Sequence, residues 1–263
     1  MRTVLSIAGS DCSGGAGIQA DLKTITAHRL YGMSVVTALT AQNTLGVQRV
    51  LPVPADFIVS QLDSVFCDIY PNSVKIGMIP DLASAEAIVG RLLSYQAPKI
   101  VIDPVMISTS GHPLSDTETT EYLLHNLFPL AELVTPNLPE LETLCGFCVK
   151  SREDMLRGAR ELYRIIHVPI LVKGGHLVED TAEDLLYDGV KTFWFSSPRL
   201  PNPNTHGTGC TLSSAIACGL AQGLSLYDSV SRAKTYITGA IRAGLSLGHG
   251  RGPLCHMYKD TSL

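Results

Sequence analysis

Residues 206–211 read His206-Gly207-Thr208-Gly209-Cys210-Thr211 and lead directly into an apolar stretch that predicts a helix. The start of a helix carries backbone N–H groups without partners and the positive end of the helix dipole. Glycines in front of it let an anion approach the main chain, so this segment predicts a phosphate-binding turn. A helix start also favours a thiolate, which makes Cys210 a candidate nucleophile or base. The alternative is a glycine-rich turn capped by Thr208 or Thr211.

The composition fits one globular α/β domain spanning residues 1–263, because 45% of the residues are hydrophobic and no linker or repeat interrupts the chain. The 20 basic and 24 acidic residues give a net charge of -4 without blocks of like charge, which argues against nucleic acid and anionic membranes as partners. No apolar run is long enough for a secretory core or a membrane span. The seven cysteines lack zinc-type spacing and fit a reducing compartment, so we expect a soluble, cytoplasmic protein.

Apolar runs of strand length alternate with stretches of helical spacing along the chain. We expect strands at residues 4–8, 32–43, 73–78, 99–103, 133–134 and 170–173, and helices at 17–29, 55–69, 82–95, 116–127, 155–166, 211–222 and 226–245. Repeated strand–helix units predict an α/β fold with a mostly parallel central sheet, flanked by helices on both faces. The turn signal Asp188-Gly189 adds one small antiparallel hairpin, between residues 184–186 and 192–195.

Polar residues gather where these strands are expected to end. They are Asp11, Gln42-Asn43, Lys75 to Met78, Asp103, Asn137 and Lys173. Each of them alone is typical of a cap or a turn. Together they predict a charged crevice, because ligands of open α/β sheets bind along the carboxyl edge of the strands.

The first loop, residues 9–21, contains Gly15-x-Gly17-x-x-Ala20, which has the spacing of a dinucleotide-binding fingerprint. Those glycines lie well beyond the strand, and no acidic residue occurs between Asp21 and Asp56 to hold a ribose. A loop that binds a small molecule is therefore favoured, with Asp21 pointing back from the first helical turn. The chain has neither a P-loop nor a protein-kinase signature.

Asn137-x-x-Glu140 opens a helix directly after a strand. An amide and a carboxylate one turn apart suit hydrated Mg²⁺, and Asp103 could add a second carboxylate. The alternative is a capping box with Asn137 as N-cap. Lys173 precedes two glycines at a strand end, where it either meets a phosphate chain or is a solvated surface lysine.

An anion-binding helix start, a magnesium site, a lysine and a candidate base are the parts that phosphoryl transfer requires. No G-x-S-x-G elbow supports serine-hydrolase chemistry. Cysteine hydrolysis through Cys210 and His206 is the remaining catalytic alternative.

Several motifs resemble the ribokinase-like small-molecule kinases and, within them, the hydroxymethylpyrimidine/phosphomethylpyrimidine kinases of thiamine biosynthesis. They are Ala8-Gly9-Ser10-Asp11-x-Ser13-Gly14-Gly15-Ala16-Gly17-Ile18-Gln19-Ala20-Asp21-Leu22-Lys23-Thr24, Ala38-Leu39-Thr40-Ala41-Gln42-Asn43-Thr44, Lys75-x-Gly77-Met78, Asp103-Pro104-Val105-Met106, Thr135-Pro136-Asn137-x-x-Glu140, Val172-Lys173-Gly174-Gly175-His176 and the segment at 206–211. They follow the family's order over nearly the whole chain.

The resemblance implies that ATP phosphorylates the hydroxymethyl group of 4-amino-5-hydroxymethyl-2-methylpyrimidine and then the resulting monophosphate. It assigns substrate binding to Gly9, Ala16, Asp21, Gln42, Met78 and Val105, the anion hole to Gly207, Thr208, Gly209 and Cys210, ATP contacts to Lys173, Thr208, Thr211 and Asn137, and Mg²⁺ to Asp103, Asn137 and Glu140. It also implies a homodimer.

One residue departs from the wider ribokinase-like pattern, in which an aspartate closes the anion-hole turn as the catalytic base. Here that residue is Cys210, as in the pyrimidine-kinase branch, and a thiol beside a phosphate resists ionisation. Two alternatives remain, a pyridoxal or pyridoxine kinase of the same branch and a binding protein without catalysis. Gln42 favours the pyrimidine, because an amide pairs with an aminopyrimidine edge.

Overall fold

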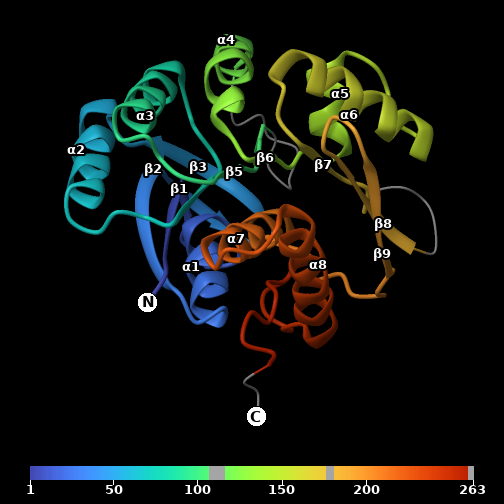
Figure 1. Ribbon diagram of the computed structural model, residues 1–263. Helices are drawn as coiled ribbons and strands as arrows, with labels where there is room; N and C mark the ends of the chain where they lie inside the picture. The colour runs from blue at the N-terminus through green and yellow to red at the C-terminus, as the bar shows by residue number, and fades with distance from the viewer. Residues whose placement is uncertain (107–115, 176–180, 260–263) are drawn as a thin grey trace.

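The computed structural model describes residues 1–106, 116–175 and 181–259. His176, part of one family motif, lies outside these ranges. The described residues build one nine-stranded sheet with helices on both faces (Figure 1). No helix in these ranges has the length and hydrophobicity needed to cross a membrane.

The sheet has the strand order β3-β2-β1-β4-β5-β6-β7-β8-β9. Its strands are β1 Thr3–Asp11, β2 Tyr31–Asn43, β3 Gly46–Pro52, β4 Ser73–Ile76, β5 Ile100–Ile102, β6 Leu133–Val134, β7 Ile170–Lys173, β8 Thr181–Tyr187 and β9 Thr192–Pro198. All pairs from β2 through β1 and β4 to β7 are parallel, which confirms the predicted mostly parallel sheet. The predicted hairpin is confirmed as β8 and β9, and β8 also pairs antiparallel with β7.

Strand β3 corrects the expectation of a single antiparallel excursion. It pairs antiparallel with β2 at the edge of the sheet, after a turn in which Asn43 Oδ1 accepts the Leu45 N–H at 2.9 Å. All of its residues are exposed or half-buried, so its sequence has no alternation of buried and exposed positions to reveal it.

Two helical layers cover the sheet (Figure 1). One contains α1 Gly17–Ala27, α7 Thr208–Ala221 and α8 Leu226–Ala243; the other contains α2 Ala55–Phe66, α3 Leu82–Ser94, α4 Thr117–Tyr122, α5 Leu138–Cys145 and α6 Arg152–Ile166. Helix α7 packs on β1, β4 and β5 and lies between α1 and α8, so every residue from Thr211 to Ala221 is buried. The helix that follows the 206–211 segment is therefore the central helix of its layer.

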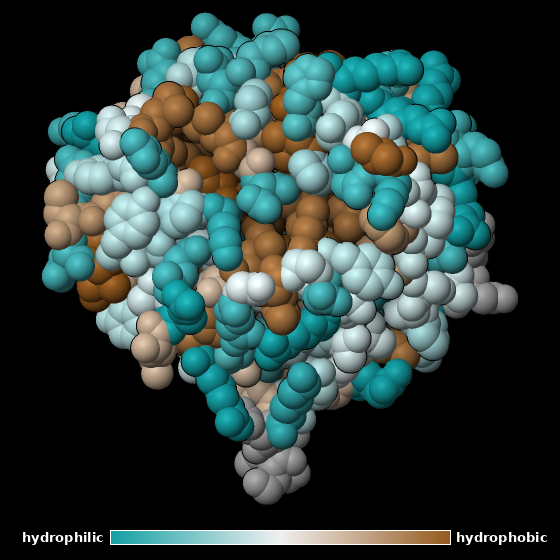
Figure 2. All heavy atoms as spheres, viewed as in Figure 1, coloured by the Kyte–Doolittle hydropathy of each residue, from teal (hydrophilic) through white to brown (hydrophobic). Residues whose placement is uncertain are grey.

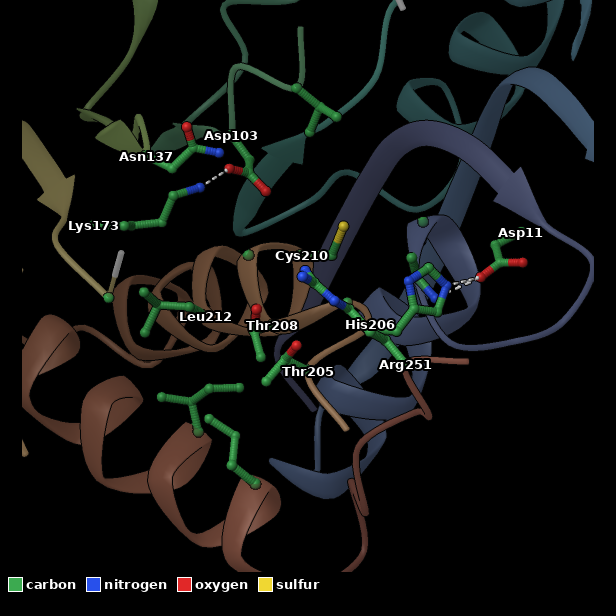
Figure 3. Close-up of a pocket in the computed structure, with 18 of the residues that line it drawn as sticks. Asp11, Asp103, Asn137, Lys173, Thr205, His206, Thr208, Cys210, Leu212 and Arg251 are labelled. Atoms are coloured by element: carbon green, nitrogen blue, oxygen red, sulfur yellow. Dashed lines mark hydrogen bonds and ion pairs between the residues drawn. The ribbon is translucent and has the colours of Figure 1, made fainter. Parts of the chain in front are cut away.

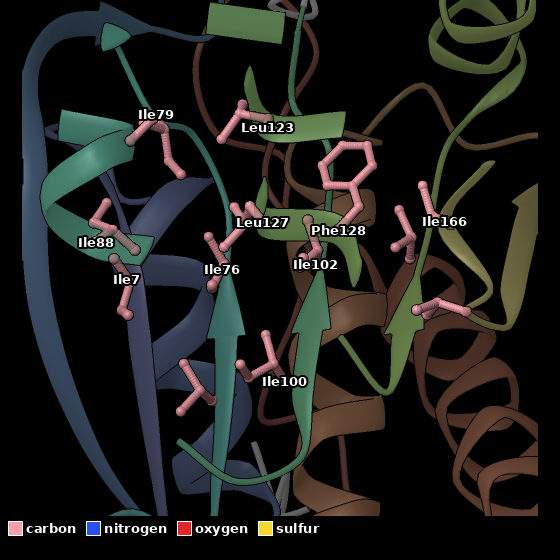
Figure 4. Packing of buried hydrophobic residues seen from close by; sticks show 14 of the residues in the cluster. Ile7, Ile76, Ile79, Ile88, Ile100, Ile102, Leu123, Leu127, Phe128 and Ile166 are labelled. Carbon is pink, nitrogen blue, oxygen red and sulfur yellow. The ribbon is translucent and has the colours of Figure 1, made fainter. Parts of the chain in front are cut away.

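A separate apolar core fills each side of the sheet. Figure 4 shows the core under α3, where Ile7, Ile76 and Ile102 from neighbouring strands meet Ile88 and Phe128. On the face shown in Figure 2, polar residues form the rim and apolar residues lie in the hollowed middle. The two cores hold the strands rigidly, which fixes the positions of the residues at their ends.

Candidate active site

A cavity of about 840 Å³ lies at the carboxyl edge of the parallel strands. Residues from the ends of β1, β2, β4, β5 and β7 form one wall, and α7 and α8 form the other. This is the ligand crevice that the strand-end residues predict. Figure 3 shows part of the lining, including Asp103, Lys173, Thr208 and Cys210.

The segment 206–211 starts α7 at the cavity wall. Gly207 is the N-cap residue with φ 82° and ψ 12°, and its carbonyl accepts the Thr211 N–H at 2.9 Å. No side chain caps this helix, so the alternative of a turn capped by Thr208 or Thr211 is wrong. In the described part of the chain the N–H groups of Gly209 and Cys210 have no hydrogen-bond partner, and they lie beside the cavity. The turn thus presents the bare N–H groups that an anion requires.

Lys173 lies between two acidic side chains opposite this turn. Its Nζ is 2.5 Å from Asp103 Oδ1 and 3.8 Å from Glu140 Oε2. Burial alone would lower the pKa of Lys173, but the two carboxylates raise it above its ordinary value. A Cβ on Gly209 would lie 3.3 Å from both Lys173 Nζ and Asp103 Oδ2, so the main chain of the turn passes close to the pair. Lys173 is therefore a charged cavity residue, and the solvated-surface alternative is wrong.

Asn137 and Glu140 form the capping box of α5. Asn137 Oδ1 accepts the Glu140 N–H at 2.9 Å, and Glu140 Oε2 accepts the Asn137 N–H at 2.7 Å. Burial, together with the repulsion of Asp103, raises the pKa of Glu140 from its ordinary 4.5 to about 7, although Lys173 opposes this. The capping alternative is confirmed, yet both residues line the cavity and remain available to a ligand there.

This donor set fits Mg²⁺. Among the described residues no three His, Cys, Asp or Glu side chains are grouped as metal ligands. Asp103 and Glu140 nevertheless offer carboxylate oxygens on either side of a cation, the Lys173 ammonium. Mg²⁺ takes one or two protein carboxylates and completes its coordination with phosphates and water, so a sparse set suits it.

Cys210 carries a neutral thiol. Burial raises the pKa of Cys210 to about 11, and the nearby carboxylates of Asp21 and Asp103 act in the same direction. The Lys75 ammonium and the Gly17 N–H lower it, but by less. The expectation that the helix start favours a thiolate is wrong here, because burial and like charge outweigh the dipole.

The residues assigned to the pyrimidine divide into two groups. The first group lines the cavity and consists of Gly9, Ala16, Gln42, Met78 and Val105. The cavity is also lined by the turn residues Gly207, Thr208, Gly209 and Cys210 and by Asp103, Asn137, Glu140 and Lys173. Gly9 lies close to Met78, since a Cβ on it would be 3.1 Å from the methionine sulfur.

Asp21 and Thr211 do not line the cavity, so neither is placed to contact a ligand there. Asp21 is fully buried and accepts hydrogen bonds from Ser6 at 2.6 Å, Ser214 at 2.7 Å and Lys75 at 2.8 Å. Thr211 is also fully buried, and its hydroxyl is 3.0 Å from His256 Nε2. Both face inward on their helices, and Lys75 reaches the cavity instead of Asp21.

Two further side-chain pairs in the cavity wall were not predicted from the sequence. His206 Nε2 is 2.8 Å from Asp11 Oδ2, and Lys234 Nζ is 2.6 Å from Asp184 Oδ2. The side-chain contacts of His206 are to Asp11 and Gln42 and not to Cys210, so no Cys–His nucleophile is formed. Three cavity residues of α8 have the i, i+3, i+7 spacing of one helix face: Lys234, Ile237 and Ile241. This spacing was the sequence signal that could have indicated which face of α8 meets the cavity.

Known proteins share both the sequence and the fold. A family model described as phosphomethylpyrimidine kinase matches residues 11–255. Thiamine biosynthesis bifunctional protein ThiED of Geobacter sulfurreducens is 49% identical over 97% of this chain, and the chain spans 52% of that relative. Hydroxymethylpyrimidine/phosphomethylpyrimidine kinase of Rhizobium meliloti is 46% identical, with 97% of each chain covered.

Two solved structures carry the same fold. Phosphomethylpyrimidine kinase from Clostridium difficile is 44% identical with a TM-score of 0.81, over 92% of this chain and 100% of that one. An ADP complex of Bacillus subtilis pyridoxal kinase is 35% identical with a TM-score of 0.92, over 99% of both chains. With its ribokinase-like sheet and its nearly full-length match, this chain belongs to the phosphomethylpyrimidine kinase family.

Proposed function

We propose that the protein transfers the γ-phosphoryl group of ATP to 4-amino-5-hydroxymethyl-2-methylpyrimidine, and then to the resulting monophosphate, in thiamine biosynthesis. One observation carries this proposal. The turn at 207–210, with its unpaired N–H groups, lines the same cavity as Gln42 and Lys173. Gln42 suits the pyrimidine, and Lys173 suits the phosphates. The relatives named as hydroxymethylpyrimidine/phosphomethylpyrimidine kinases support the same substrate.

The residues divide the work of the reaction. The N–H groups of Gly209 and Cys210 stabilise the charge on the transferring group, and Lys173 neutralises the phosphate chain. Asp103, Asn137 and Glu140 would hold Mg²⁺, which when bound offsets the negative charge of the phosphates. The neutral thiol of Cys210 cannot take the proton of the substrate hydroxyl, and a loose transition state needs little base assistance.

A substrate panel tests this proposal. ATP consumption is measured with hydroxymethylpyrimidine, with its monophosphate and with pyridoxal. Turnover on both pyrimidines is expected, whereas turnover on pyridoxal alone would refute the proposal. Binding of the pyrimidine without ATP consumption in the presence of Mg²⁺ would identify a non-catalytic binding protein instead.

Pyridoxal phosphorylation is the second candidate, because the Bacillus subtilis pyridoxal kinase has a TM-score of 0.92 to this chain. Sequence identity favours the pyrimidine, at 44% with the Clostridium difficile kinase against 35% with the pyridoxal kinase. The presence of Gln42 in the cavity wall also favours the pyrimidine substrate.

Glu140 gives the stability of the protein a defined pH dependence. Its folded-state pKa of about 7 lies above the ordinary 4.5, so the folded protein holds this proton more tightly than the unfolded chain. The resulting stabilisation is complete below pH 4.5 and is lost as the pH rises through about 7. In Glu140→Gln, which keeps the capping box, the free energy of unfolding is expected to fall less over this window than in the wild type.

Urea unfolding at several pH values measures that difference, with the exposed Glu132→Gln as the matched control. Parallel profiles for wild type and Glu140→Gln would contradict the assignment. Mg²⁺ is also expected to raise the melting temperature of the wild type more than that of Glu140→Gln.

We also propose that two copies associate through the β2–β3 edge. Leu39 and Leu51 are cross-strand partners, and they are 49% and 55% exposed. Exposed apolar side chains on an edge strand, such as Leu51 on β3, favour pairing with another chain. A light-scattering mass of twice the 28.2 kDa chain mass is expected, and a monomer mass would refute this proposal.

The continuous sheet supports one kinase domain over residues 1–263. The seven cysteines are all free, which supports a reducing compartment.

A further inference from the structure

In the proposed second phosphorylation, two anionic groups meet in the cavity. The acceptor in that step is a phosphate monoester, which carries a charge of about −1.5 to −2 at pH 7. It has to approach the γ-phosphoryl group of ATP, which is assigned to the turn at 207–210 and to Lys173. Because like charges repel, this step requires a cation on the acceptor side of the turn.

Arg251 is the cation of the cavity whose charge is not compensated. Among the described residues, three lysines and two arginines line the cavity. Arg199 has an interaction partner. In residues 1–106, 116–175 and 181–259 the guanidinium of Arg251 makes no hydrogen bond and no ion pair, and the side chain is exposed. All three lysines are paired with carboxylates: Lys75 with Asp21, Lys234 with Asp184, and Lys173 with Asp103 and Glu140.

The main chain before Arg251 is fixed to the turn between β2 and β3. The Gly250 N–H donates to the Thr44 hydroxyl at 3.1 Å. A Cβ on Gly250 would collide with the Thr44 carbonyl oxygen, so this position has no room for a side chain. Thr44 follows Gln42 by two residues, which places Arg251 next to the part of the cavity that is assigned to the pyrimidine.

The main chain after Arg251 is fixed to the segment that leads into the phosphate-binding turn. The Gly252 N–H donates to Asn204 Oδ1 at 3.0 Å, and the Gly252 carbonyl accepts the His206 N–H at 3.2 Å. A Cβ on Gly252 would collide with the Asn204 side chain. Arg251 therefore stands between two anchored glycines, and in Figure 3 its side chain extends toward the start of α7.

We propose that Arg251 binds the phosphate group of the pyrimidine monophosphate and thereby determines how well the protein accepts this second substrate. A guanidinium presents a planar fork of N–H donors, which matches two oxygens of a phosphate. The unphosphorylated pyrimidine has no such group, so Arg251 favours the monophosphate over it. This inference rests on the proposed function, which supplies both substrates.

Dissociation constants measured by calorimetry test the inference. They are measured separately for hydroxymethylpyrimidine, for its monophosphate and for a non-hydrolysable ATP analogue. The ratio of the first two constants is the phosphate preference. Arg251→Ala is expected to lower this preference about tenfold or more, as the loss of hydrogen bonds to a charged group does, while binding of the ATP analogue changes less than about twofold. Arg251→Lys keeps the charge without the fork and is expected to retain part of the preference.

Two further measurements separate a specific contact from a general effect of charge. Raising the ionic strength is expected to lower the phosphate preference of the wild type and to leave that of Arg251→Ala nearly constant. Arg2→Ala is the matched control, because it removes an exposed arginine directly before β1, at the opposite end of that strand from the cavity. Its phosphate preference is expected to equal that of the wild type.

Three results would overturn the inference. They are an unchanged phosphate preference in Arg251→Ala, the same loss of preference in Arg2→Ala, and a loss of affinity for the ATP analogue as large as the loss for the monophosphate. The third result would assign Arg251 to the phosphates of the donor. Failure of the wild type to bind either pyrimidine would instead refute the proposed function itself.

Discussion

Replacing Lys173 by methionine is expected to lower kcat by about 10²–10³-fold, the usual effect of removing one preorganised charge-stabilising group. Without its ammonium, the Asp103 and Glu140 carboxylates face each other and the incoming phosphates with no opposing charge. Removal of one partner of a buried ion pair also destabilises a fold by about 3–5 kcal/mol. Steady-state kinetics and urea unfolding measure the two effects.

Lys191→Met is the control for this experiment, because it removes an exposed lysine in the β8–β9 turn, away from the cavity. The stability loss in Lys173→Met is expected to shrink at low pH, where protonation removes the unpaired charges. A kcat within a few-fold of the wild type would show that Lys173 does not act on the transferring group.

Gly207→Ala is expected to lower kcat by about 10²-fold, as a displacement of about 1 Å of catalytic groups does. Gly207 has φ 82°, and a Cβ on it would collide with the carbonyl oxygen of Gly15. The turn must then move away from the first loop, and the Gly209 and Cys210 N–H groups move with it.

Gly223→Ala separates backbone strain from that collision. Gly223 follows the other end of α7 with φ 86° and has open space around its Cβ position. It is expected to lose about 1 kcal/mol of stability with unchanged kcat, because only the positive φ is penalised. Equal kinetics for the two variants would show that the approach of Gly207 to Gly15 does not matter for catalysis.

The sequence predicts the parallel part of the sheet well, because buried strands such as Ile100–Ile102 are short apolar runs between helices of clear periodicity. It also predicts that the strand ends meet, since parallel strands share one carboxyl edge. The exposed edge strand β3 escapes prediction, because pairing with β2 and not burial creates it.

Which side of a helix faces the cavity is harder to predict. Asp21 and Thr211 are polar residues near helix starts, as ligand-binding residues often are, but both face inward to buried partners. The Asp11–His206 pair is equally hidden from local patterns, because 195 positions separate its members. Only the assembled sheet, which places β1 beside the start of α7, brings them together.

That separation ties catalytic competence to the completion of folding. A contact between the first strand and a helix near the end of the chain closes a very large loop, and its entropic cost is offset by the contacts of the strands that lie between them. The turn at 207–210 and the first loop therefore face each other only once β1 and α7 have come together. A ligand that binds between them contacts both the first strand and α7, so it stabilises the two ends of the chain together.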